Sequence, residues 1–113
     1  MNCRRGDVVL VLFPDSNLRT SKRRPALVVQ ADGLGSGLSQ TIVAMITSNM
    51  ARAGHPARVI VSLGGHKSSG LLTDSVIMTD NLAMVHHSEI DCVIGFLSGM
   101  SEIDAALRTT LAL

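Results

Sequence analysis

The 113-residue sequence predicts a mainly β domain, either a small barrel or a strongly curled antiparallel sheet, with one helix at the C-terminus. Three observations predict this fold class. Short runs of β-branched and leucine residues recur at close spacing, turns rich in Gly, Ser and Pro separate them, and the apolar period becomes helical only in the last thirteen residues. No gap between the runs is long enough for several crossover helices, which argues against a parallel α/β sheet.

The first half of the chain contains three predicted strands. The first is DVVLVLF (7–13), which ends at the turn PDSN. The second is PALVVQA (25–31), with Pro25 at its first position, where a missing N–H costs least. The Gly/Ser-rich stretch 32–40 predicts a loop, and TIVAMIT (41–47) predicts the third strand.

The second half contains three more predicted strands. They are ARVIVSL (57–63), DSVIMTD (74–80) and DCVIGFLS (91–98), and the stretch GGHKSSG (64–70) predicts a turn between the first two. Gly95 inside the last strand indicates a bulge or a bend.

The tail SEIDAALRTTLAL predicts a short amphipathic helix. Ser101 is suited to cap it, and Glu102 and Asp104 fall in the first turn, where negative charge favours the helix dipole. Three apolar residues recur at every fourth position: Ile103, Leu107 and Leu111.

Length and composition predict one domain over residues 1–113 with a substantial core. Hydrophobic residues make up 46 % of the chain, and the charged fraction of 17 % is low, which suggests a buried subunit interface. Aromatic residues make up 2 %, so an RNA-binding surface that works by stacking bases on aromatic rings is hard to build.

The cysteines and the apolar runs predict the compartment. Cys3 and Cys92 lack the spacing of metal ligands, and no secretory leader precedes them, so we expect reduced thiols in a cytoplasm. No apolar run approaches the about 18 residues that a membrane span needs.

The net charge of +1 hides a polarity along the chain. Residues 1–24 contain six Lys or Arg side chains against two Asp, and residues 73–113 contain six Asp or Glu side chains against one Arg. Four of the cations fall within 19–24, immediately before Pro25. Such a cluster suits a polyanion, although a solvated charged loop would have the same composition.

Four motifs follow one another along the chain and together cover nearly all of it: RRGDVVLVLFP, SKRRPALVVQ, MITSN and GLLTDSVIMTDNL. In this order they resemble the PemK/MazF family of toxins from bacterial toxin–antitoxin pairs. The resemblance implies an SH3-like β-barrel that forms a homodimer and cuts single-stranded RNA without a metal or other cofactor. It also implies an antitoxin partner that covers the site with an acidic, flexible segment.

The same resemblance gives the catalytic roles to Arg24, in the RP motif, and to Thr47, at the end of the third strand. Both residue types suit cleavage by the neighbouring 2′-hydroxyl. Arginine is permanently charged and presents a planar fork of donors to phosphate oxygens, and a threonine hydroxyl donates from a side chain with restricted χ1. The alternative for Arg24 is a strand-end ion pair with Asp80 or Asp15, and for Thr47 an ordinary strand end.

The proton acceptor is less evident from the sequence. Asp80 aligns with an acidic position of some relatives, so it is a candidate for the base or for an RNA contact, or else a surface carboxylate. Four histidines have a suitable pKa but lie in polar or Gly/Pro/Ser-rich segments, which favours loop histidines: His55, His66, His86 and His87.

Further residues are candidates for RNA contacts. Phosphate contacts are expected from Arg19, Lys22, Arg23 and Arg58, while Ser48 and Asn49 follow the catalytic threonine. Polar residues of the loop before the second strand are suited to read base edges: Ser16, Asn17, Thr20 and Ser21.

The sequence also departs from the family pattern. Relatives often carry Gln-x-Arg-Thr after the acidic position, whereas Asn81 and Ala83 stand here in place of the glutamine and the arginine. Two alternatives to the RNA-cutting toxin therefore stay open at this point. One is a non-enzymatic toxin of the CcdB type that inhibits DNA gyrase, and the other is a degenerate, inactive member of the family.

Overall fold

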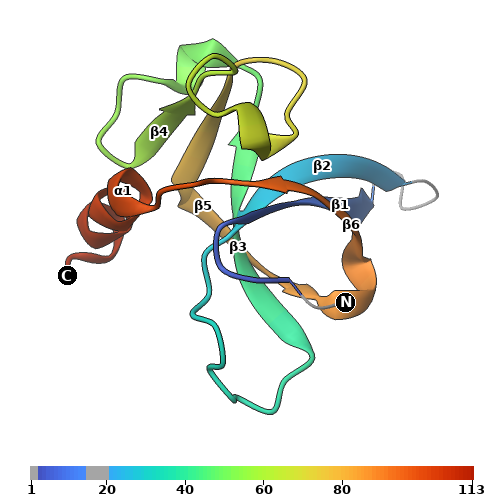
Figure 1. Ribbon diagram of the computed structural model, residues 1–113. Coiled ribbons are helices and arrows are strands. Elements are labelled where there is room, and N and C mark those ends of the chain that lie inside the picture. Colours follow the sequence, from blue (N-terminus) through green and yellow to red (C-terminus); the bar gives the residue numbers. More distant parts are fainter. Residues whose placement is uncertain (1–2, 15–20) are drawn as a thin grey trace.

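A computed structural model describes residues 3–14 and 21–113, and in them six strands form one antiparallel sheet followed by a single α-helix (Figure 1). The predicted fold class is therefore confirmed. The strands lie in the spatial order β4-β5-β3-β2-β1-β6. The strands are β1 (Asp7–Pro14), β2 (Ser21–Val28), β3 (Gln40–Thr47), β4 (Arg58–Val61), β5 (Ser75–His86) and β6 (Ile90–Phe96). The helices are the 3-10 turns η1 (Met50–Arg52), η2 (Lys67–Ser69) and η3 (His87–Glu89) and the α-helix α1 (Ser101–Leu111).

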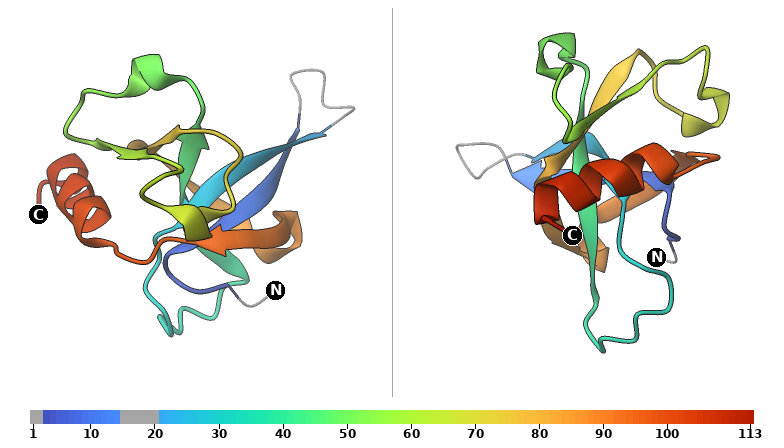
Figure 2. Two further views of the ribbon diagram at one scale, coloured as in Figure 1. Left: turned by 45° about the horizontal axis from the view of Figure 1, so that its top comes forward. Right: turned by 90° about the vertical axis from the view of Figure 1, so that its left-hand side faces the viewer.

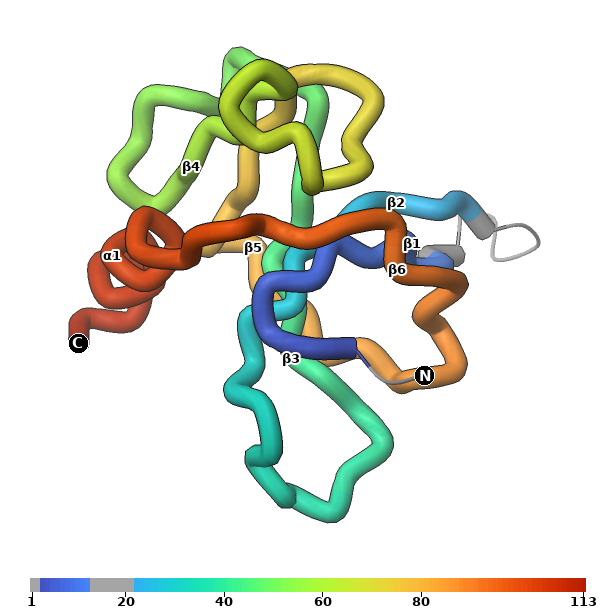
Figure 3. Tube along the Cα trace, in the orientation of Figure 1, coloured from blue at the N-terminus to red at the C-terminus, as the bar shows by residue number. Residues whose placement is uncertain are grey.

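The sheet curls but does not close into a hydrogen-bonded barrel, because β4 and β6 remain its two edges. The segment that carries η2 lies beside β6 in all views (Figures 2 and 3). The Ser68 hydroxyl donates to the backbone carbonyl of Phe96 at 2.9 Å. The turn predicted at 64–70 thus holds a short 3-10 helix that braces one edge of the sheet.

Both faces of the sheet are apolar, and each packs its own core. Side chains alternate between the faces along a strand, so that Val43 and Met45 of β3 belong to one core while Ala44 and Ile46 belong to the other. We call the face of Ala44 the helix face, because Ile103 of α1 packs there. The opposite face, which we call the outer face, has as its buried residues Val9, Val11, Ala26, Val28, Val43, Met45, Val85 and Ile90.

Strand β2 begins four residues before the predicted start, and Pro25 lies inside it. The prediction that Pro25 opens the strand is therefore wrong. At Pro25 the neighbour of β2 is β1, through Leu10, whereas pairing of β2 with β3 begins only at Ala26. A proline that cannot donate a hydrogen bond is tolerated where one side of the strand is open.

Strand β5 is twelve residues long and continues well past the predicted end at Asp80. Met45 pairs with Met78 and Ala44 with Leu82, so three residues of β5 have no opposite residue on β3. This bulge consists of Thr79, Asp80 and Asn81, and it bends the strand without ending it. The polar pair at 80–81 has the composition of a strand end, which explains the short prediction. Strand β4 is shorter than predicted, and is confined to 58–61.

Two glycines allow η2 and β6 to touch backbone to backbone. A Cβ on Gly70, whose φ is 74°, would overlap the carbonyl group of Ile94, and a Cβ on Gly95 would overlap the backbone of Ser68 and Ser69. The predicted irregularity at Gly95 is confirmed, because the β1–β6 register shifts between the pairs Val8–Gly95 and Val9–Val93.

Helix α1 spans Ser101–Leu111, and Ser101 is its first helical residue, so the prediction that Ser101 caps it is wrong. Met100 occupies the cap position, and no side chain caps the helix there. Ile103 and Ala106 are buried and the partly buried Leu107 packs against the same core, while Leu111 is 52 % exposed. Arg5 Nη2 lies 2.7 Å from Asp104 Oδ1, which ties the helix to the start of the chain. None of the helices in the described residues has both the length and the apolar character that a membrane crossing requires.

Candidate active site

Arg24 and Thr47, the two predicted catalytic residues, face each other across neighbouring strands. Strands β2 and β3 pair from Ala26 with Met45 to Val28 with Val43, and the same register continued by two residues sets Arg24 opposite Thr47. The alternation of side chains puts both on the outer face, together with Ala26 and Met45. The structure therefore brings the two residues together.

Two hollows meet at this pair, and Arg24, Ile46 and Thr47 line both of them. The first hollow has a volume of about 510 Å³ and a largely apolar floor. Its other lining residues are Leu10, Arg23, Pro25, Ser48, Gly70, Leu71, Leu72, Thr73, Ser75 and Ile94. The second hollow has a volume of about 440 Å³, and its other lining residues are Met45, Met78, Asn81 and Ala83.

The polar atoms of the pair are available to a ligand. Arg24 is exposed, and no carboxylate among the described residues lies within ion-pair distance of it. The Thr47 Oγ1 atom accepts a hydrogen bond from the backbone N–H of Asn49 at 3.1 Å. Because a hydroxyl carries one donor and two acceptor sites, the Thr47 hydroxyl hydrogen is left to donate to an anion.

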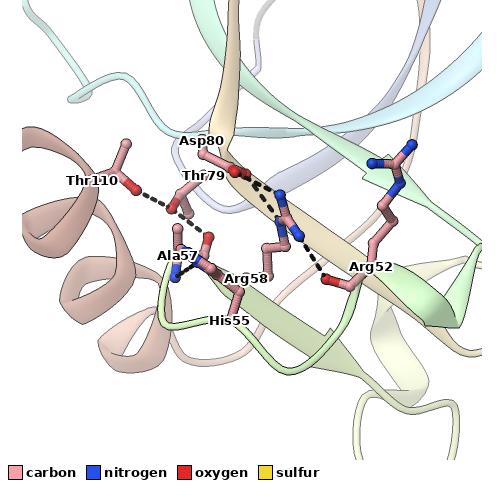
Figure 4. A network of polar contacts seen from close by, with 7 residues as sticks. All are labelled: Arg52, His55, Ala57, Arg58, Thr79, Asp80 and Thr110. Carbon is pink, nitrogen blue, oxygen red and sulfur yellow. Dashed lines mark hydrogen bonds and ion pairs between the residues drawn. The ribbon is translucent and has the colours of Figure 1, made fainter.

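The sequence left open an ion pair between Arg24 and Asp80. The structure excludes it, because Asp80 pairs with Arg58. Arg58 Nη2 lies 2.8 Å from Asp80 Oδ2, and Arg58 Nε donates to Oδ1 at 3.3 Å (Figure 4). The Arg58 hydrogen bond and charge hold the pKa of the Asp80 carboxyl below its ordinary value of 3.8. A carboxylate with a lowered pKa is a weaker base, and Asp80 lines neither hollow. Asp15, the other alternative partner, lies outside the described residues.

Two of the predicted phosphate-binding cations are held by carboxylates of the protein. Arg58 makes the pair just described and also donates to the Arg52 carbonyl at 3.2 Å. Arg23 Nε lies 3.1 Å from Asp91 Oδ2, across β1 on strand β6. Lys22 is exposed on β2. Arg19 lies outside the described residues, as do Ser16, Asn17 and Thr20, and nothing is described of the Ser21 side chain.

The other predicted RNA contacts lie on the segment that follows Thr47. Ser48 is exposed and lines the first hollow. Asn49 is the cap of η1, where its side-chain oxygen accepts from the N–H of Ala51 at 3.1 Å.

The four histidines line neither hollow. Three of them have local structural contacts: His55 Nδ1 accepts from the Ala57 N–H, His66 Nδ1 lies 3.3 Å from the Ser62 carbonyl, and His86 accepts from the Ser88 N–H. His55 and His66 lie in loops, as predicted, whereas His86 is the last residue of β5 and His87 is the first residue of η3.

Several residues of the site were missed from the sequence. Met45 and Met78 are directly opposite each other in the β3–β5 register and line the second hollow. The alternation that places Met45 on the face of Thr47 was the available signal. Arg52 of η1 lines neither hollow, and its backbone carbonyl accepts a hydrogen bond from Arg58 (Figure 4).

Comparison with known proteins identifies the family. The model of the PemK-like, MazF-like toxin of type II toxin–antitoxin systems matches residues 4–111. The chain is 34 % identical over 105 residues to Endoribonuclease MazF2 of Mycobacterium bovis, covering 90 % of each protein. It is 33 % identical over 117 residues to Endoribonuclease EndoA of Bacillus subtilis, covering 100 % of this chain and 97 % of that protein.

Solved structures share the fold. An endoribonuclease in complex with its cognate antitoxin from a mycobacterial species superposes with a TM-score of 0.77 at 23 % identity, over 99 % of this chain and 97 % of that chain. A MazE–MazF structure from Deinococcus radiodurans gives a TM-score of 0.74 at 19 % identity, over 98 % and 97 % of the two chains. Since the family model spans nearly the whole chain and curated relatives align along its length, the chain belongs to the PemK-like, MazF-like toxins of type II toxin–antitoxin systems.

Proposed function

We propose that this toxin is an endoribonuclease that cuts single-stranded RNA, including mRNA, by attack of the neighbouring 2′-hydroxyl and without a metal ion. The observation that carries the proposal is the facing pair Arg24 and Thr47, exposed where two hollows meet. The curated relatives named endoribonuclease support the reaction class. We infer that the protein acts in the cytoplasm, because the proposed substrate includes mRNA.

The two side chains have separate tasks in this reaction. The 2′-hydroxyl gives its proton to a water molecule as its oxygen attacks phosphorus. The bond from phosphorus to the 5′-oxygen breaks, a proton from water passes to the departing 5′-oxygen, and negative charge grows on the two non-bridging oxygens. Arg24 offers these oxygens a fork of charged donors, and the Thr47 hydroxyl donates a further hydrogen bond. The products are a 2′,3′-cyclic phosphate and a 5′-hydroxyl. Asp80, held by Arg58, supports the position of its neighbours instead of accepting the 2′-hydroxyl proton.

The partners follow from the surface around the pair. The first hollow has an apolar floor with Arg23 and Arg24 at its rim, which suits a flexible antitoxin segment that carries both apolar and acidic side chains. Relatives of this fold occur in complexes with an antitoxin. Large apolar side chains such as Met84, Val93 and Phe96 are 41–56 % exposed, which supports association of two copies into a homodimer.

The proposal is tested by incubating the purified protein with a mixed single-stranded RNA in EDTA and analysing the new ends. Cleavage that leaves 2′,3′-cyclic phosphates is expected. Absence of cleavage, or products with a 3′-hydroxyl and a 5′-phosphate, would overturn the proposal. Mapping the cut sites on the same RNA gives the sequence preference.

A further inference from the structure

The second hollow has the composition of a site for a flat, partly apolar group. Met45, which is 8 % exposed, lies beside the half-buried Met78 and Ala83. Thioethers are polarizable and make favourable contacts with aromatic rings. Among the described residues, the polar side chains that line this hollow are those of Arg24, Thr47 and Asn81, and the last of these carries an amide.

The amide of Asn81 is free to recognise a ligand. Asn81 is exposed at the mouth of the hollow, and its side chain makes no hydrogen bond with the described residues. An amide offers both a donor and an acceptor, and this combination matches the paired hydrogen-bonding groups on the edge of a nucleobase. A wall with one such amide over an apolar floor is typical of small-molecule sites.

The bulge of β5 fixes the direction in which Asn81 projects. Thr79, two residues earlier, is fully buried, and its hydroxyl lies 2.6 Å from the Ala57 carbonyl and 2.9 Å from Thr110 Oγ1 (Figure 4). Asp80, the next residue, accepts hydrogen bonds from Nε and Nη2 of Arg58. Both residues before Asn81 are therefore anchored, and bulges of this kind re-aim side chains next to functional sites.

The hollow adjoins the position at which the reaction would occur. Arg24 and Thr47 form part of its wall and also part of the wall of the first hollow. A phosphate held by the two side chains would stand on the ridge between the hollows. That phosphate joins two nucleotides, and the base of one of them could then enter the second hollow.

We propose that the second hollow binds the nucleobase next to the scissile phosphate and that Asn81 reads the hydrogen-bonding edge of this base. This inference rests on the proposed endoribonuclease function. The small side chain of Ala83 keeps the hollow open, and Asn81 determines the base preference at that position. A well-formed pair of hydrogen bonds to a base edge discriminates against the wrong base by roughly 5- to 150-fold.

The test uses RNA oligonucleotides that contain the mapped cut site with a 2′-deoxy residue at the attacking position, so that binding is measured without cleavage. Each of the two positions that flank the cut carries in turn one of the four bases or an abasic residue. We expect the wild type to discriminate among bases at one of these positions. Asn81→Asp, which exchanges the amide donor for an acceptor, should abolish that preference or transfer it to another base.

Ala83→Leu fills the hollow and supplies a second, independent readout. It should weaken binding at least about tenfold when a base is present at the position and leave the abasic oligonucleotide unaffected. Ala105→Leu, the same change on the exposed side of α1, is the matched control and should leave every affinity unchanged. Thermal unfolding of each variant verifies that it is folded.

The outcomes separate this inference from the proposed function. If the wild type cuts RNA but both variants keep its base preference and affinity, the assignment of the hollow is wrong. If Ala83→Leu changes the oligomeric state and leaves RNA binding unchanged, a second copy of the chain occupies the hollow, and the inference is also wrong. If the wild type neither cuts nor binds RNA, the proposed function itself fails.

Discussion

Arg24 stands directly before Pro25 on β2, and the residue before a proline is restricted to extended backbone conformations. The guanidinium is therefore presented from a stiff strand, although it is exposed to solvent. Its neighbour Arg23 differs from it, because Arg23 is paired with Asp91. Position and lack of a described partner make Arg24 the member suited to transition-state stabilisation.

Replacing Arg24 by alanine should lower the cleavage rate by about 100-fold or more, because preorganised donors at a developing oxyanion contribute roughly 3–4 kcal/mol. The measurement is the initial rate on a defined single-stranded RNA at saturating substrate. Lys22→Ala, the loss of a nearby exposed cation, is the control and should mainly weaken binding. Equal losses of rate in the two variants would contradict the special role of Arg24.

Asp80 allows a prediction about pH. The folded-state pKa of its carboxyl is below the ordinary value of 3.8, so the pair with Arg58 stabilises the fold above that pH, and the stabilisation is lost as the pH falls through the folded-state pKa. Because the pair is partly exposed, the effect at neutral pH should be no more than about 1 kcal/mol. The unfolding free energies of the wild type and Asp80→Asn should therefore differ at neutral pH and converge in acid.

The same variant tests the role of Asp80 in cleavage. A general base contributes about 10²- to 10⁴-fold to the rate, so a loss of that size in Asp80→Asn would make Asp80 the proton acceptor. A smaller loss, with a pH–rate profile of unchanged shape, is the outcome expected for a residue that positions Asn81.

The secondary-structure elements that could be predicted correctly are those whose own residues determine whether they form a strand or a helix. The β-branched runs of β1 and β3 predicted strands at nearly the observed bounds, and the change of period predicted α1. The first half of β2 was missed because polar residues occupy it, and the second half of β5 was missed because the polar pair at 80–81 has the composition of a strand end. These segments are strands because of their partners, β1 and β3, which no local pattern reveals.

The candidate site was predictable to a similar degree. The motifs indicated Arg24 and Thr47, and the register of β2 and β3 brings them together. The second hollow was not predictable, because a three-residue bulge places Asn81 beside Met45 and Met78. The partner of Arg23, Asp91, was missed because it is distant in sequence and approaches Arg23 only through the order of the strands in the sheet.

The contact between η2 and β6 gives a prediction for two glycines. Gly95→Ala should destabilise the fold by about 1–3 kcal/mol, because its Cβ would overlap the backbone of Ser68 and Ser69. Gly64→Ala is the control, since no atom lies within 4 Å of a Cβ there and its cost should be within about 0.5 kcal/mol. Chemical denaturation measures both. A cost for Gly95→Ala as small as that of the control would show that the two segments separate readily.

At the scale of the whole molecule, the opposite charges of the two ends of the chain meet in ion pairs. Arg5 pairs with Asp104 and Arg23 with Asp91, so carboxylates of the C-terminal part offset cations of the N-terminal part. The charge available to an RNA backbone is therefore smaller than the sequence cluster suggests.

Asp91→Asn should release Arg23 for a phosphate contact. The affinity for a non-cleavable single-stranded RNA should rise, and the slope of log affinity against log salt should steepen by about 0.7, the value for one added contact. Glu102→Gln removes the same charge from an exposed position on α1 and controls for net charge. If both variants change the slope equally, the Arg23–Asp91 pair does not restrain RNA binding.

The alternation of two cores along β3 also limits how this sequence can change in length over generations. Gain or loss of one residue within β3 would turn Val43 and Met45 to the side now filled by Ala44 and Ile46, and both cores would be disrupted at once. The exposed glycine-rich loop at 32–39, which extends from the body of the protein in Figure 1, contributes to neither core. Insertions and deletions among descendants should therefore accumulate in this loop, while β3 keeps its length.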